Sequence, residues 1–324
     1  MDGDLMSWFF FALICVLGWG LADLFYKKSA DDADGTSHLK TAVWVGITMG
    51  AVSVILLPFS ESGLSSGGLL RNAFAYLPAS LSYIISMVIG YAGLRYLELS
   101  IVSPVQNASG AFSLIVMLMY FTFSGNTAAF SDTFGTLDII GTVMIVAGTV
   151  GLAAAEQKLS KAETEKTEKK YRTGAMALIF PLLYCLFDTI GTAADGVILS
   201  EEAGLGLGEI DVLVLYGLTF FAAGIVCWLY MRLKSGKPYN PFKKSEMPKC
   251  AASVCEQFGQ IFYVFAMARE PMLAAPMVAS YCIISVILSR IFLREKLQRS
   301  LAVCVLFVIF GIVLLGISEG LAEA

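Results

Sequence analysis

The sequence predicts an all-α polytopic membrane protein, with ten transmembrane helices arranged as two inverted five-helix repeats. Three observations predict it: an apolar composition, ten long apolar runs, and a similarity between the two halves of the chain. Of the 324 residues, 57% are hydrophobic and 15% are charged, and the mean hydropathy is +0.75. A soluble protein of this size could not keep so much apolar surface away from water.

The apolar runs have the length that a bilayer requires, since a hydrocarbon core of about 30 Å needs roughly 20 residues of helix. Pro and Gly inside several runs are tolerated, because neighbouring helices can satisfy the freed backbone groups. The ten runs lie near residues 5–26, 39–58, 73–96, 100–123, 134–155, 173–199, 212–231, 250–268, 271–293 and 299–318.

The first run does not have the pattern of a cleaved signal peptide, because Asp2 and Asp4 stand where a basic segment is expected and the run is too long. The seven cysteines lie within or at the ends of apolar runs and form no C-x-x-C pair, so we expect packing residues and no disulfide framework. A single histidine, His38, cannot build a metal site. We therefore expect no metal and no cofactor.

Basic residues predict the orientation in the membrane. The loops after helices 1, 3, 5, 7 and 9 hold 20 of the 22 Lys and Arg residues, and the opposite side holds only Arg71 and Arg269. Because cytoplasmic loops are enriched in Lys and Arg, both termini are predicted to lie outside the cytoplasm, with the chain a multi-pass protein of the cell (inner) membrane. The segment 156–172, with mixed charges, is predicted to be a cytoplasmic linker, so the domains are a first repeat at 1–155 and a second at 173–324.

The two halves resemble each other without gaps over two stretches. "ALICVLGWGLAD" (12–23) aligns with "ALIFPLLYCLFD" (177–188), and 89–119 aligns with 261–291. Matched pairs include Asp23 with Asp188, Trp19 with Tyr184, Tyr91 with Tyr263, Glu98 with Glu270, and Pro104 with Pro276. Since five helices is an odd number, the second copy enters the membrane from the other side, which gives an inverted repeat. Such repeats are typical of transporters with a site near the bilayer midplane.

Three stretches resemble a known family: "GWGLADLFYKK" in the first helix, "RYLELSIVSPVQ" before and into the fourth, and "AREPMLAAP…SRIFLREKL" through the ninth. They are similar to the EamA family of the drug/metabolite transporter superfamily, over essentially the whole chain. The resemblance implies a ten-helix secondary transporter or exporter of small metabolites. It also implies a central cavity lined mainly by helices 1, 3, 4, 6, 8 and 9.

Two features depart from that family. The Gly-Glu pair that commonly ends its fourth and ninth helices is represented by Glu295 in the second half, whereas the first half has "FTFSGNTAAFSD" without a carboxylate at that place. Members are also often expected to keep both termini in the cytoplasm, and the distribution of Lys and Arg here predicts the reverse.

Two carboxylates of the repeat are candidate site residues. Asp23 has two interpretations: an interfacial anchor that pairs with Lys27 one turn later, or a carboxylate at the rim of a cavity. Asp188 has no basic residue within the next turn of its helix and lies about 15 residues beyond the linker, so we interpret it as functional. Trp19 and Tyr184 are their matched aromatic neighbours.

A polar stripe in the eighth helix supplies further candidates. Glu256, Gln260 and Tyr263 recur at i, i+4 and i+7, on one face that lipid would reject. A structural hydrogen-bond network and a substrate or proton site are both open interpretations. Tyr91 is the first-half counterpart of Tyr263.

Polar residues follow a proline in the fourth and ninth helices. Gln106 and Asn107 follow Pro104, and Ser280 and Tyr281 follow Pro276. Unwound backbone there could bind a substrate, and a simple helix kink is the alternative.

No Lys or Arg lies deep within any predicted helix, and strongly anionic substrates would need such a counter-charge. The sequence therefore favours a secondary active transporter, an exporter or exchanger, for a small neutral, zwitterionic or cationic metabolite. Its mechanism would be alternating access, and proton coupling is compatible with the buried carboxylates.

The alternatives are a membrane enzyme acting on a lipid or small metabolite, for which "DDAD" (31–34) is a weak metal-binding pattern, and a non-transporting membrane protein. We expect the lipid bilayer and a metabolite as partners and no nucleic acid, with monomer and homodimer both open.

Overall fold

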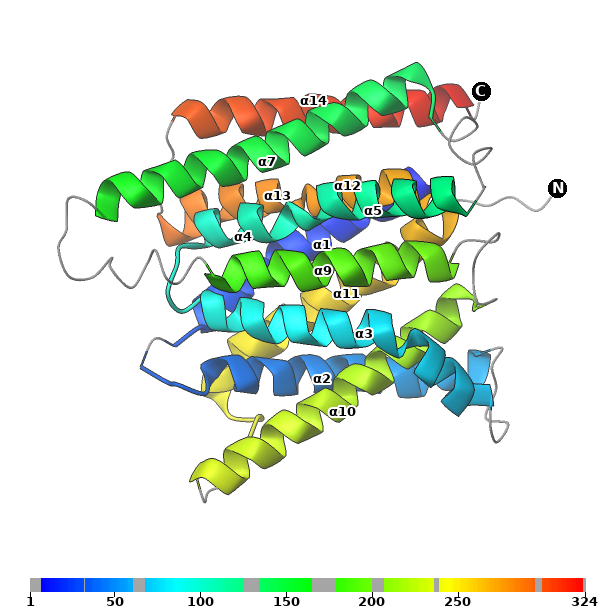
Figure 1. Ribbon diagram of the computed structural model, residues 1–324. Helices are drawn as coiled ribbons and strands as arrows, with labels where there is room; N and C mark the ends of the chain where they lie inside the picture. The colour runs from blue at the N-terminus through cyan, green and yellow to red at the C-terminus, as the bar shows by residue number, and fades with distance from the viewer. Residues whose placement is uncertain are drawn as a thin grey trace.

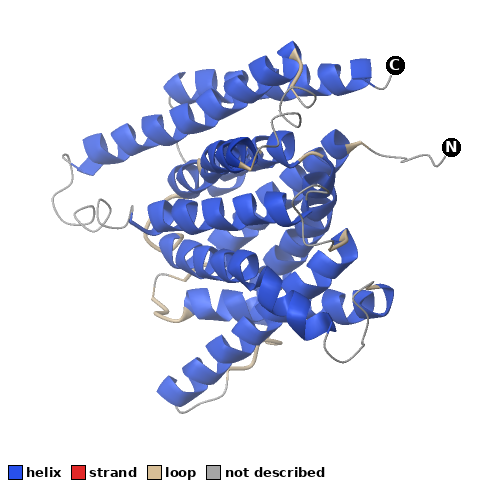
Figure 2. Ribbon diagram, turned by 45° about the vertical axis from the view of Figure 1, so that its right-hand side comes forward, coloured by secondary structure: helices blue, strands red, loops and turns tan. Residues whose placement is uncertain are grey.

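The computed structural model describes residues 7–31, 33–60, 68–124, 134–164, 179–199, 207–235, 239–294 and 299–322. This part of the chain is helical and contains no strand (Figure 2). Its main helices are α1 (Trp8–Ser29), α2 (Ser37–Leu56), α3 (Gly68–Gly93), α4 (Leu99–Asn107), α5 (Ser109–Phe123), α7 (Thr136–Thr164), α9 (Ile179–Leu199), α10 (Glu209–Ser235), α11 (Met247–Arg269), α12 (Pro271–Ala279), α13 (Tyr281–Leu288) and α14 (Arg299–Ala322).

Nine candidate membrane spans occur among the described residues, which confirms a multi-pass membrane protein by helix length and composition. α4 with α5 forms one span, Leu99–Phe123, and α12, α13 and a π-helical turn form another, Pro271–Leu293. α11 covers the predicted run 250–268 but is not among the nine. Its 23 residues make a helix of about 34 Å. The tenth crossing therefore stays a prediction.

The helices lie side by side with their axes running broadly across the view (Figure 1). α1 begins, and α14 ends, at the same end of the bundle. The predicted linker is partly an extension of α7, which continues to Thr164. Residues 165–172 of that linker, and Glu295, lie outside the described residues.

Each half packs mainly against the other half. The most extensive helix contacts join α1 to α11, α2 to α10, α3 to α9 and α7 to α14. Glycines permit three of these contacts: a Cβ added at Gly18 would lie 3.0 Å from the Cα of Gly259, and one added at Gly46 would lie 3.0 Å from the Cα of Gly224. In the third contact, a Cβ added at Gly141 would lie 2.9 Å from a backbone oxygen of α14. Small residues at such crossings let two backbones approach closely, so the halves are interleaved.

The fourth and ninth predicted helices are each broken in two. α4 contains Pro104 and ends at Asn107, and α12 contains Pro276 and ends at Ala279. Proline removes a backbone donor and clashes with the carbonyl of the preceding turn, which weakens each of these short helices. The breaks bring the polar residues that follow each proline into the centre of the bundle.

Candidate functional site

A polar cavity of about 740 Å³, including its open mouth, lies in the centre of the bundle. Eleven of the twelve residues predicted for the site line this cavity: Trp19, Asp23, Tyr91, Gln106, Asn107, Tyr184, Asp188, Glu256, Gln260, Tyr263 and Tyr281. Ser280 does not line it. It is buried at the junction of α12 and α13, and its hydroxyl makes no hydrogen bond among the described residues.

Serines from both halves hold the Asp23 carboxylate. Ser103 of α4 and Ser285 of α13 each donate a hydrogen bond of 2.6 Å to the same oxygen, Oδ2. Lys27 points elsewhere, and its Nζ donates to the carbonyl oxygens of Leu94 and Leu97 at 2.6 and 2.7 Å. Asp23 makes no ion pair with Lys27 in the described part of the chain. The interpretation of Asp23 as an anchor paired with Lys27 is therefore wrong for this structure, and the carboxylate belongs to the cavity wall.

Replacing Ser285 by Ala is expected to destabilise the protein, because a hydrogen bond to a charged group contributes roughly 1.5–3 kcal/mol. The measurement is the midpoint of SDS-induced unfolding of the purified protein. Ser124→Ala is the control, because Ser124 is exposed and bonds only to carbonyls of its own helix. Equal midpoints for Ser285→Ala and wild type would refute a structural role for this bond.

Asp188 has a comparable environment in the other repeat. Ser109 of α5 donates a hydrogen bond of 2.6 Å to its Oδ2, and the hydroxyl of Tyr184 lies beside the carboxylate. In the repeat alignment the counterpart of Ser285 is Ser113, which instead donates to the carbonyls of Ser109 and Thr189. The carboxylates match between the halves, but their serine partners are offset by about one turn.

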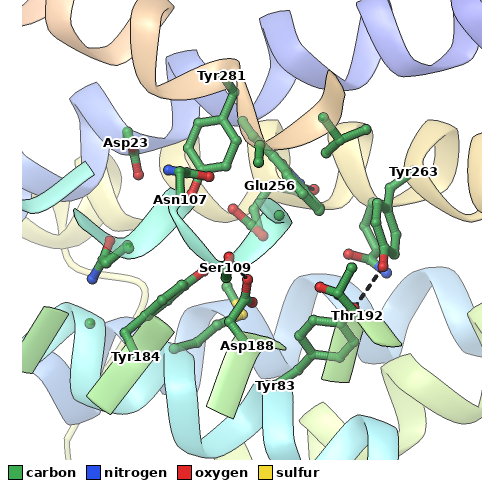
Figure 3. Close-up of a pocket in the computed structure, with 18 of the residues that line it drawn as sticks. Asp23, Tyr83, Asn107, Ser109, Tyr184, Asp188, Thr192, Glu256, Tyr263 and Tyr281 are labelled. Carbon is green, nitrogen blue, oxygen red and sulfur yellow. Dashed lines mark hydrogen bonds between the residues drawn. The ribbon is translucent and has the colours of Figure 1, made fainter. Parts of the chain in front are cut away.

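Glu256 lies between these two aspartates and faces the cavity (Figure 3). The residue is 8% exposed, and its carboxylate makes no hydrogen bond within the described residues. Only its backbone oxygen is engaged, by the indole N–H of Trp19 at 3.2 Å. Gln260, one turn on, has a buried Nε2 that makes no hydrogen bond to the part of the chain that the structure describes. The polar stripe had two interpretations, a structural hydrogen-bond network and a substrate or proton site. The first does not describe Glu256, because the acceptor oxygens of its carboxylate are available to a ligand.

Aromatic rings form most of the remaining wall. The centroid of the Trp19 ring lies 5.1 Å from the centroid of the Tyr263 ring and 5.6 Å from that of the Tyr281 ring. Tyr91 donates a hydrogen bond of 3.2 Å to the hydroxyl of Tyr26, and their ring centroids are 4.7 Å apart. Such a wall offers both π faces and hydroxyl groups to a solute.

Sequence reasoning missed several wall residues: Tyr26, Tyr83, Ser109, Thr192 and Tyr216. Tyr216 belongs to α10, which the family resemblance does not include among the lining helices. Tyr83 and Tyr216 sit in apolar runs where an aromatic is typical of packing, so no signal singled them out. The sequence did carry a signal for Thr192, because it follows Asp188 by one helical turn and lies on the same face of the helix.

The charge of the cavity is one-sided. Its described lining contains three carboxylates, Asp23, Asp188 and Glu256, and no Lys, Arg or His. No group of His, Cys, Asp or Glu that could hold a metal occurs among the described residues.

The acidic loop behind the enzyme alternative has a local explanation. The carboxylate of Asp34 pairs with Lys40 at 2.6 Å and accepts hydrogen bonds from Thr36. Burial alone would raise the pKa of Asp34, but these bonds outweigh it and lower the pKa to about 2. The Asp34 carboxylate is therefore engaged by its own loop and by Lys40. It does not line the central cavity.

Comparisons with known proteins support the fold alone. No protein-family model matches the chain, and a search of curated proteins gives no match. A solved structure described only as "Crystal structure of protein" superposes with a TM-score of 0.61 and is 14% identical. The match covers 94% of this chain and 95% of the other, so the whole helical arrangement is shared with a protein whose description gives no function.

Proposed function

We propose that this chain is a secondary active transporter, an exporter or exchanger similar to the EamA family, for a small neutral, zwitterionic or cationic metabolite. The observation that carries the proposal is the central cavity, with three carboxylates, an aromatic wall and no basic side chain in its described lining.

The charges in the cavity support the substrate class. An anionic solute would meet three carboxylates without a counter-charge in the described lining, and their repulsion would disfavour its binding. A cation would gain both the carboxylates and the ring faces. A carboxylate that alternately holds a proton and the solute would also couple transport to a proton gradient, which we include in the proposal.

The packing of the halves supports alternating access. Every major contact joins one helix from each half, as two inverted five-helix repeats would require, with α11 as the tenth membrane crossing. The cavity lies at the junction, since Asp23 comes from the first half and Glu256 and Asp188 from the second. Rocking one half against the other would then open the cavity to either side.

The test begins with a thermal-shift screen of metabolites on detergent-solubilised protein, followed by flux measurements in proteoliposomes. Metabolites that raise the unfolding temperature should be cationic, zwitterionic or neutral, and should accumulate or leave liposomes without chemical change. Recovery of a modified product would favour the membrane enzyme. Binding restricted to anions would overturn the proposed substrate class.

The proposed orientation places both termini outside the cytoplasm of a cell with an inner membrane. Ser124→Cys, at the end of α5, should react with a membrane-impermeant maleimide in intact cells. Lys28→Cys, at the opposite end of the bundle, should react only after permeabilisation. Both positions are exposed, whereas the seven native cysteines are buried or half-buried, so the wild-type chain gives the background. The reverse pattern would show that the chain is inserted the other way round.

A further inference from the structure

A further carboxylate in the interior, Asp195, lies outside the cavity. It follows Asp188 by two helical turns on α9, so the two share a face of that helix. Asp195 is fully buried, with 0% of its surface exposed. Neither of its carboxylate oxygens makes a hydrogen bond to a described protein group. Asp195 is not part of the cavity wall, so binding of a solute in the cavity does not explain why a carboxylate is buried here.

The neighbours of Asp195 are hydroxyl groups. Tyr76 and Tyr83 approach from α3 and Tyr263 from α11, and the hydroxyls of all three lie beside the carboxylate. Tyr76 is also fully buried, and its hydroxyl has no hydrogen-bond partner among the described residues. Two unpartnered polar groups therefore face each other in the interior, each able to donate or accept a proton.

Among the described residues, no cation neutralises this carboxylate. The titratable groups that face it are Tyr76 and Tyr83 of α3, Tyr216 of α10, Tyr263 of α11 and Asp188 of its own helix. The adjacent Gly196 is covered by the side chains of Met117 from α5 and Pro271 from α12, which carry no charge. A bare carboxylate without a counter-charge is costly at membrane depth, and a bound proton removes that charge.

A chain of hydroxyls connects this group to the cavity. Tyr83 and Tyr263 share a hydrogen bond of 2.6 Å, and Tyr83 donates one of 3.2 Å to Thr192 (Figure 3). All three line the cavity, whereas Asp195 and Tyr76 lie behind them. Each hydroxyl can accept a proton on its oxygen while it passes its own proton onward, so a proton can move along the chain without a change in the covalent structure.

We propose that Asp195, with the hydroxyls of Tyr76, Tyr83 and Tyr263, is a proton-binding site outside the metabolite cavity that exchanges its proton with the cavity through Tyr83 and Thr192. If the chain is the transporter proposed above, this site holds a proton in reserve and passes it to the cavity, where proton and solute compete for a carboxylate. The proton leaves the Asp195 carboxyl as H⁺ and returns to it in the next cycle.

Infrared spectroscopy of the purified protein tests the site without a substrate. At neutral pH, wild type should show absorption from a protonated carboxyl that Asp195→Asn removes and Tyr76→Phe shifts. Asp211→Asn is the matched control, because Asp211 is also buried but accepts a hydrogen bond from Ser60, and it should keep this absorption. If Asp195→Asn fails to fold, the shift in Tyr76→Phe, compared with Tyr230→Phe at an exposed site, decides the question.

Two outcomes would overturn the proposal. The first is a protonated-carboxyl absorption that neither Asp195→Asn nor Tyr76→Phe changes. The second is a change of the Asp195 absorption on addition of sodium chloride but not choline chloride, which would make the group a cation site. A separate measurement tests the proton path through Tyr83 and Thr192. Exchange of the Asp195 carboxyl proton for deuterium should slow severalfold in Tyr83→Phe, and an unchanged rate would exclude a path through Tyr83. These readouts do not depend on transport, so their failure is distinguishable from failure of the proposed function.

Discussion

Replacing Glu256 by Gln is expected to remove the dependence of transport on a pH gradient and to weaken binding of a cationic or zwitterionic solute about 10- to 100-fold. The carboxylate faces the cavity between Asp23 and Asp188 and receives no hydrogen bond from the described residues, so its charge is available to the solute. A hydrogen bond to a charged group contributes roughly 1.5–3 kcal/mol, and 1.4 kcal/mol is a factor of ten in affinity. Gln keeps the shape and loses both the charge and the exchangeable proton.

The measurements are ligand affinity from thermal shift and flux into proteoliposomes with and without a pH gradient. In wild type, solute affinity should fall as the pH falls, because protons compete for the same carboxylate, and Glu256→Gln should flatten this dependence. Glu319→Gln is the control, since Glu319 accepts a hydrogen bond of 2.7 Å from Trp8 and lies outside the cavity wall. An unchanged pH dependence in Glu256→Gln would show that Glu256 is not the site of competition.

Replacing Gly217 by Ala is expected to destabilise the fold by about 1–3 kcal/mol, the usual cost of overpacking a tight contact. A Cβ at this position would lie 1.9 Å from the Oγ of Ser53 and 2.5 Å from the backbone oxygen of Met49. The serine side chain can rotate, but the backbone of α2 cannot yield without moving the helix against α10. This contact belongs to the α2–α10 pair, so the loss should appear in the whole bundle.

Gly320→Ala provides the matched comparison, because Gly320 is also helical and nothing lies within 4 Å of its added Cβ. Alanine has the higher helix propensity, so this variant should be as stable as wild type or slightly more stable. The SDS-unfolding midpoint measures both variants. A Gly217→Ala midpoint no lower than that of Gly320→Ala would mean that the α2–α10 contact relaxes freely.

The sequence predicts the helical, multi-pass character of this fold well, because a bilayer imposes one length and one polarity on every crossing helix. The run predicted at 271–293 has the bounds of the span Pro271–Leu293, and the other spans differ by a few residues. The repeat alignment also singled out Asp23 and Asp188, since paired carboxylates in apolar segments are costly without a shared role.

The partners of these residues could not be predicted in the same way. Ser103 and Ser285 hold Asp23 from helices far apart in the chain, and that contact depends on how the helices pack. Lys27 was the obvious partner because only neighbours along one helix are visible in a sequence. Asp195 had a local signal, a polar residue two turns after Asp188, but its ring of tyrosines exists only once α3, α9 and α11 meet.

The distance along the chain between Asp23 and Ser285 sets a delay during synthesis. The two residues are 262 positions apart, so at 5–20 residues per second the ribosome needs about 13–50 s to make the second after the first. α1 enters the bilayer long before α11 and α13, the helices that cover its polar face, have been translated. During that interval Lys27, one turn from Asp23, is the nearest positive charge in its own helix. In the completed bundle, Ser103 and Ser285 bond the Asp23 carboxylate instead.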